Sequence, residues 1–112
     1  MQKLVSAYKL WHEYFPHFPK TSRYTIGEKI DTLFIEIIEN VIIASFLSKQ
    51  EKVPSIKNGL VKLDVLKFFL QVAWEIKAFD NKKYIELSEQ LHEVGKMLGG
   101  WKKGLENKTL AM

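Results

Sequence analysis

Hydrophobic residues recur with the period of an α-helix along most of this chain, and no segment alternates apolar and polar residues as a surface strand does. Short stretches with proline or turn-forming residues separate four such segments. The predicted helices span residues 2–16, 21–48, 55–79 and 81–103, and residues 104–112 are expected to form a flexible tail. The pattern predicts an all-α, up-down-up-down four-helix bundle in a single domain covering residues 1–112.

The two central predicted helices carry more apolar surface than a small bundle buries. Each has a second apolar stripe beside its core stripe, and exposing such side chains would forfeit about 1.5–3 kcal/mol each. Exposed apolar patches of this size mark interfaces. We therefore predict a homo-oligomer. The predicted interface residues are Phe34, Ile38, Ile42, Phe46, Phe69, Val72, Ile76 and Trp101. The alternative is a tightly wrapped monomer in which these two helices are unusually central.

Positive charge is concentrated in two short segments. The chain has a net charge of +4, and residues 49–67 and 94–112 each carry a net charge of +3. In an up-down-up-down bundle these segments meet at one end. Such a basic face attracts phosphate backbones with little sequence preference. Alternatively, the lysines complement helix dipoles and keep the protein soluble.

No constellation of residues points to catalysis, to a metal or to a cofactor. The chain has no cysteine, which excludes disulfides and thiolate metal sites. His12 and His17 lack the spacing of a helical metal pair, and no Glu-x-x-His motif is present. Because catalytic motifs are missing, we expect that the protein is not an enzyme. Signal-peptide and membrane-spanning patterns are also missing, so we expect a cytoplasmic protein that does not enter a membrane.

Residues 94–104, VGKMLGGWKKG, combine glycines, a tryptophan and two lysines near the predicted end of the last helix. Gly99 and Gly100 could end this helix in a left-handed cap, or could pack within it against another helix. Trp101 is expected to fold back onto the end of the bundle or onto a neighbouring subunit.

Three segments together resemble the accessory variability determinant (Avd) family of diversity-generating retroelements. They are FPKTSRYTIGEKI (18–30), KLDVLKFFL (62–70) and EVGKMLGGWKKG (93–104). The resemblance covers the chain from about Leu4 to Lys103. The more distant relatives are the four-helix-bundle proteins encoded in intervening sequences of 23S ribosomal RNA genes.

This resemblance implies a pentameric, barrel-like assembly with a positively charged surface and no catalytic residues. It also implies two kinds of partner: RNA or DNA, bound largely without sequence specificity, and the reverse transcriptase that copies a template RNA during mutagenic retrohoming. Carrying over the motifs adds Lys67, Lys96 and Arg23 as candidate binding residues, and the charge pattern adds Lys62, Lys102 and Lys103. For Arg23, a structural ion pair with an acid of the second predicted helix is favoured slightly over a phosphate contact.

Better-known members of the family are more basic than this chain, which has one arginine and 13 acidic residues. We therefore expect nucleic-acid binding that is weak and sensitive to salt, or a main partner that is a protein. Two other functions remain open at this point: an RNA-associated role like that of the intervening-sequence proteins, and a purely structural or antitoxin-like oligomeric module.

Overall fold

A computed structural model describes residues 1–110, with side chains for residues 1–107, and this part of the chain is almost entirely helical. In chain order the elements are α1 (Gln2–Tyr14), η1 (Phe15–His17), α2 (Lys20–Ser22), η2 (Arg23–Gly27), α3 (Glu28–Phe46), α4 (Lys49–Glu75) and α5 (Asn81–Leu110). The described residues form no strand, which confirms the prediction of an all-α protein.

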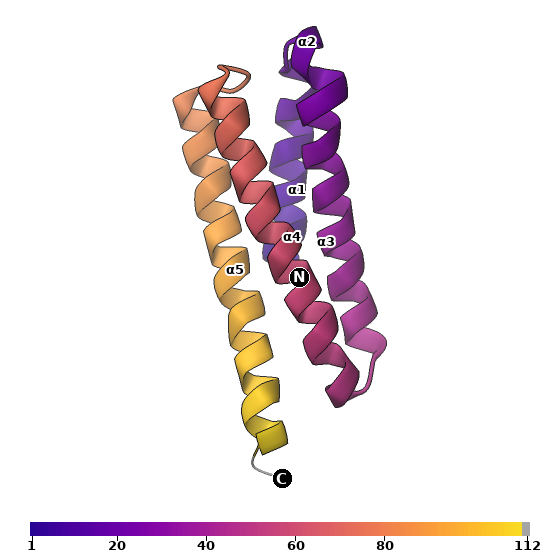
Figure 1. Ribbon diagram of the computed structural model, residues 1–112. Helices are drawn as coiled ribbons and strands as arrows, with labels where there is room; N and C mark the ends of the chain where they lie inside the picture. Colours follow the sequence, from indigo (N-terminus) through magenta and orange to yellow (C-terminus); the bar gives the residue numbers. More distant parts are fainter. Residues whose placement is uncertain (111–112) are drawn as a thin grey trace.

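Four long helices lie side by side in alternating directions (Figure 1). α3 packs against α4, α4 against α5, and α5 against α1, while α1 also contacts α3 and closes the ring. α1 has only 13 residues, about 20 Å, in a molecule 52 Å long. It therefore covers only the part of the bundle that includes α2 and the α4–α5 connection (Figure 1).

Several predicted helix boundaries are corrected by the structure. The helix expected at 21–48 is instead α2, the π-helical η2 and then α3, which ends at Phe46. α4 begins at Lys49 instead of residue 55 and contains Pro54. Ser48 has an extended backbone and is the N-cap residue from which the helix begins. Pro54 is exposed and removes only one backbone hydrogen bond, so the helix tolerates it near its beginning.

The last helix is longer than expected. Residues 104–110 continue α5 as a regular helix and do not form the flexible tail predicted from the sequence, while residues 111–112 lie outside the described part of the chain. Leu105 follows Leu98 by seven residues and is buried, so it extends the apolar stripe of α5 by two turns. Burial of Leu105 stabilises the additional helical turns of α5.

An aromatic cluster forms the core where α1 is present. Trp11 is fully buried and contacts the rings of Phe18, Phe34 and Phe79, with centroids 5.3–6.2 Å apart. Phe34 has no exposed surface, so its predicted place at an oligomer interface is wrong: α1 covers it inside the protomer.

One carboxylate joins α1 to α3 beside this cluster. Asp31 Oδ1 accepts hydrogen bonds from the Tyr8 hydroxyl at 2.9 Å and from the Trp11 indole Nε1 at 3.1 Å. Burial, together with the hydrogen bond to Asp31, raises the pKa of Tyr8 to about 12. This junction holds the short first helix in register with α3.

Candidate nucleic-acid interface

The two basic segments meet at one end of the bundle. The α3–α4 connection and the last turns of α5 lie at the same end of the molecule (Figure 1). The Lys52 ammonium lies 5.7 Å from the centroid of the Trp101 ring, which brings the start of α4 into contact with the end of α5. Trp101 packs against the core, as predicted. A cation over an indole ring is a favourable contact, so Trp101 also helps to hold this end together.

A groove runs between α4 and α5 on the outer side of this pair of helices. It has a volume of about 390 Å³, and its lining residues are Asp64, Lys67, Phe68 and Gln71 from α4 and Tyr84, Ser88 and His92 from α5. The lining has one lysine and one aspartate from α4, and aromatic side chains from both helices. That mixture suits nucleic acid, whose phosphates need cations and whose bases stack on rings.

Lys67 lies across the surface of α5 at Gly95. A Cβ atom added at Gly95 would lie 3.5 Å from the Lys67 ammonium nitrogen and 3.4 Å from the Leu63 Cδ2 atom. Lys67, the second lysine of the motif KLDVLKFFL, therefore meets Gly95, the first glycine of the motif EVGKMLGGWKKG. This contact places the two family motifs in one surface.

Helical spacing adds two further lysines to the groove side. Lys96 follows His92 by four residues, and Lys103 follows Lys96 by seven, so all three lie on one face of α5. Lys96 and Lys103 are exposed. Lys96 also pairs with Glu93 at 3.7 Å, an exposed ion pair of small energetic value. Of the sequence-predicted lysines, Lys67 lines the groove, while Lys96 and Lys103 lie further along α5 on the face that carries His92.

Two other predicted lysines are engaged by carboxylates. Lys62 lies on the side of α4 that faces α3 and pairs with Glu36 at 3.4 Å, so it does not belong to the groove. Lys102 pairs with Glu106 one turn further along α5 at 3.0 Å, and only about a quarter of its side chain is exposed. A phosphate would have to displace a carboxylate at either position.

Arg23 has a structural position instead of a ligand-binding one. Its Nη2 donates hydrogen bonds to the carbonyl oxygens of Pro16 at 2.8 Å and Phe18 at 3.1 Å. Its Nε is buried without a hydrogen-bond partner in the described part of the chain. The guanidinium group holds the π-helical turn against the connection after α1. The predicted role of Arg23 as a phosphate contact is therefore replaced by a structural role.

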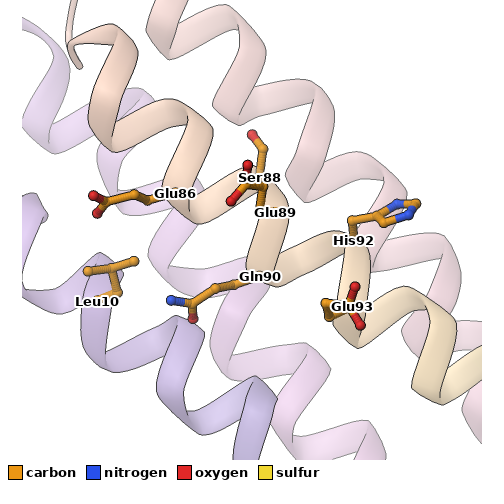
Figure 2. A pocket seen from close by; sticks show the side chains of 7 residues that line it. All are labelled: Leu10, Glu86, Ser88, Glu89, Gln90, His92 and Glu93. Atoms are coloured by element: carbon orange, nitrogen blue, oxygen red, sulfur yellow. The ribbon is translucent and has the colours of Figure 1, made fainter.

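The other side of α5 is acidic. A cavity of about 660 Å³ beside α1 is lined by Leu10, Glu86, Ser88, Glu89, Gln90, His92 and Glu93. In Figure 2, Glu86 and Gln90 point toward Leu10 of α1, whereas His92 projects from the opposite side of the helix. Glu86 accepts a hydrogen bond from the Tyr14 hydroxyl at 2.7 Å. Three glutamates make this side unfavourable for phosphates, although the cavity adjoins the α4–α5 groove at Ser88 and His92.

The structure settles the open question about Gly99 and Gly100. Neither glycine has a positive φ, and α5 continues through both, so they do not end the helix. A Cβ atom added at either position would meet nothing within 4 Å, so no other part of the described protomer packs on them. They leave an open, side-chain-free stretch of helix between Lys96 and Lys103.

The remaining predicted interface residues differ in exposure. Ile42, Phe46 and Ile76 are exposed, Phe46 by 84%, whereas Ile38, Phe69, Val72 and Trp101 are only partly exposed. Ile42 and Phe46 lie on the part of α3 that the short α1 leaves uncovered. Sequence reasoning missed Phe68, which is 61% exposed while Phe69 packs against the core. Helical periodicity could have distinguished the two phenylalanines, because Phe68 falls among the polar residues of α4, opposite the core stripe, whereas Phe69 flanks that stripe.

Other chemistry is not evident in the part of the chain with described side chains. This part holds no group of three histidine or acidic residues close enough to bind a metal ion. Its helices include none that is long and apolar enough to cross a membrane.

Comparison with known proteins gives one match. A family model described as bAvd-like matches residues 1–105, nearly the whole chain. Neither the curated proteins nor the solved structures contain a significant match. The matched range includes the two motifs that meet at Gly95 and Lys67. The chain therefore belongs to the bAvd-like family.

Proposed function

We propose that this protein is a non-catalytic accessory protein of a diversity-generating retroelement, which acts in the cytoplasm as a homo-oligomer. In this role it binds the reverse transcriptase and nucleic acid, either the template RNA or its cDNA. The bAvd-like family is a non-catalytic accessory family, which supports the general role. The nucleic-acid site is the α4–α5 groove.

The observation that carries the nucleic-acid proposal is that Lys67 lines the α4–α5 groove at Gly95, with Lys96 and Lys103 further along the adjoining face of α5. They come from two helices and from the two segments of highest positive charge. Two carboxylates of α5 are engaged by α1, because Glu86 accepts a hydrogen bond from Tyr14 and Glu93 pairs with Lys3. A phosphate backbone can thus approach Lys67 without meeting Glu86 first, whereas at Lys96 it competes with the exposed carboxylate of Glu93.

The test of binding is a titration of labelled RNA and DNA with the protein at low and moderate salt. A triple variant, Lys67→Glu, Lys96→Glu and Lys103→Glu, should lower affinity by at least about tenfold and reduce the salt dependence by about two to three phosphate contacts. The matched control changes Lys9, Lys20 and Lys29 to glutamate, which gives the same net charge away from the groove. If both triple variants lost affinity equally, net charge and not the groove would be responsible.

Homo-oligomerisation is supported by apolar side chains that the protomer leaves exposed on α3 and α4. Phe46 and Ile42 lie beyond the part of α3 that α1 covers, Val61 lies on α4, and Ile76 lies at its C-terminal end. Burying such side chains is favourable by about 1.5–3 kcal/mol each. A pentamer is what the family resemblance implies. Sedimentation of the wild type and of the variants Phe46→Glu and Ile42→Glu tests this assembly: we expect dissociation into folded protomers, and a monomeric wild type would remove the proposal.

Association with a reverse transcriptase is tested by looking for a reverse-transcriptase gene beside the gene for this protein and by co-purification with its product. A protein that binds RNA but no reverse transcriptase would support the role of an intervening-sequence protein instead. A stable oligomer that binds neither would support a purely structural module.

A further inference from the structure

Two aromatic rings form an ordered platform at one end of the α4–α5 groove. Trp74 of α4 and Tyr84 of α5 are stacked, with centroids 5.0 Å apart and planes inclined by 11°. The Trp74 indole Nε1 donates a hydrogen bond to Asn81 Oδ1 at 2.6 Å, which fixes the orientation of the ring. Trp74 is nevertheless 38% exposed. The rings are held in place before any ligand arrives, so a further ring could join the stack at little entropic cost.

The platform lies between two hollows, and each hollow has a lysine in its wall. Tyr84 lines the groove that also contains Lys67 and His92. Trp74 lines a second cavity of about 640 Å³, together with Glu75, Lys77, Phe79, Asp80 and Asn81. A strand that passed along the groove and over the rings would have a cation on either side of the stacked position. Alternation of rings and cations is typical of sites for single strands.

The backbone at Lys77 is unusual and points to the same place. Lys77 has a φ of 64°, in the left-handed region. The residue ends α4 in a Schellman turn, where Ala78 N–H donates to the Ala73 carbonyl at 2.8 Å and Lys77 N–H donates to the Trp74 carbonyl at 3.0 Å. Glycine is the usual residue at this position, because a side chain destabilises the left-handed conformation. Strain of this kind is concentrated at functional sites, and here it sets a lysine beside an exposed indole.

The carboxylates of the second cavity are partly engaged within the protein. Asp80 accepts the Lys83 N–H at 2.9 Å, which caps the start of α5. Glu75 accepts a hydrogen bond from the Gln71 amide at 3.2 Å. Their remaining oxygens can accept N–H groups from the edge of a base, although they repel a phosphate. The phosphates are therefore better placed toward Lys67 and Lys77, with the base over the rings.

We propose that the groove binds single-stranded nucleic acid, RNA or DNA, with one base stacked on Trp74 and the backbone passing Lys67 and Lys77. This inference rests on the nucleic-acid binding proposed above and adds selectivity for single strands. Bases in a duplex already stack on their neighbours, so a duplex can use the lysines of the groove but not the ring of Trp74.

The experiment compares labelled oligouridylate, oligothymidylate and a duplex of equal length in anisotropy titrations at low salt. Trp74→Leu removes the ring and should weaken single-strand binding by about tenfold, within the range measured for one stacked base. Duplex binding should stay within about twofold of the wild type. Trp74→Phe keeps an aromatic face and should restore most of the affinity for single strands. Melting curves verify that both variants are folded.

Lys77→Gly gives a second variant in which binding and stability change in opposite directions. Relief of the left-handed backbone should make it more stable, while loss of the cation should weaken single-strand binding severalfold. Equal losses for single strands and duplex in Trp74→Leu, or no loss for single strands, would overturn the stacked site. The groove proposal would survive that result if the Lys67, Lys96 and Lys103 triple variant still lost affinity. A wild type that bound no nucleic acid would remove both proposals.

Discussion

Alanine at Gly99 or Gly100 should stabilise the protein, although both residues belong to the motif that carries the family resemblance. Both lie inside α5 with negative φ, and an added Cβ atom would meet no atom within 4 Å. Glycine in a helix interior is less stable than alanine by about 0.5–1 kcal/mol. We expect each single substitution to raise the free energy of unfolding by about that amount. The double variant should gain about 1–2 kcal/mol.

Gly27→Ala provides the contrasting control within the same chain. A Cβ atom there would lie 2.7 Å from Phe15 Cε1 and 3.3 Å from the carbonyl oxygen of Ser22. The ring of Phe15 packs against Trp11, with centroids 5.1 Å apart, so it cannot move without disturbing the core. Overpacking of this kind costs about 1–3 kcal/mol, so this variant should be less stable than the wild type.

Urea denaturation followed by circular dichroism measures both effects, with the midpoint interpreted at constant slope. A gain of 1 kcal/mol should raise the melting temperature by about 4 °C in a chain of this size. The measurement is repeated at several protein concentrations, because assembly contributes to apparent stability. If Gly99→Ala or Gly100→Ala lost stability, another chain or molecule would occupy the space above the glycines, and the reasoning from the protomer would be refuted.

Three further predictions concern the ends of the helices and the junction between α1 and α3. Asp31→Ala leaves the Tyr8 hydroxyl and the Trp11 indole without their acceptor, and should lower the free energy of unfolding by about 2–4 kcal/mol in urea melts; a change below about 0.5 kcal/mol would contradict this role. Lys77→Gly should raise it by about 0.5–1 kcal/mol through relief of the left-handed backbone, as the same melts would measure. The raised pKa of Tyr8, about 12, makes the neutral phenol the form that the fold prefers. Its contribution to stability is therefore complete below pH 10 and is lost as the pH rises toward 12, a loss that thermal melts should show and that Tyr8→Phe should reduce.

Several features of this molecule could be predicted from the sequence. The helical spacing of Tyr84, Leu87, Leu91, Val94 and Leu98 predicts one buried face of α5; the last four residues are buried and Tyr84 is half-buried. The positions of the two basic segments, combined with alternating helix directions, predicted that they meet at one end of the bundle. Lys52 over Trp101 is the contact that confirms it. These features depend on periodicity and topology alone, which a sequence contains directly.

Other features could not be predicted, because they depend on which neighbour covers a given helix face. Phe34 and Phe46 belong to the same apolar stripe of the sequence, yet one is fully buried and the other is 84% exposed. The difference arises because α1 packs over the first and ends before the second. Lys62 and Lys67 are likewise only five residues apart in one segment. Lys62 pairs with Glu36 of α3, whereas Lys67 lines the groove between α4 and α5.

The sequence by itself determined that this chain folds into helices, which side of the last helix is buried, and where its positive charge is concentrated. It did so because hydrophobic period and charge position are local properties of the chain. The tertiary structure alone decided that Lys67 crosses Gly95, that Arg23 supports a turn, and that Trp74 stacks on Tyr84. Each of these contacts joins two different segments of the chain. The contacts depend on how the helices pack and on how the turns are folded, which local sequence patterns do not contain.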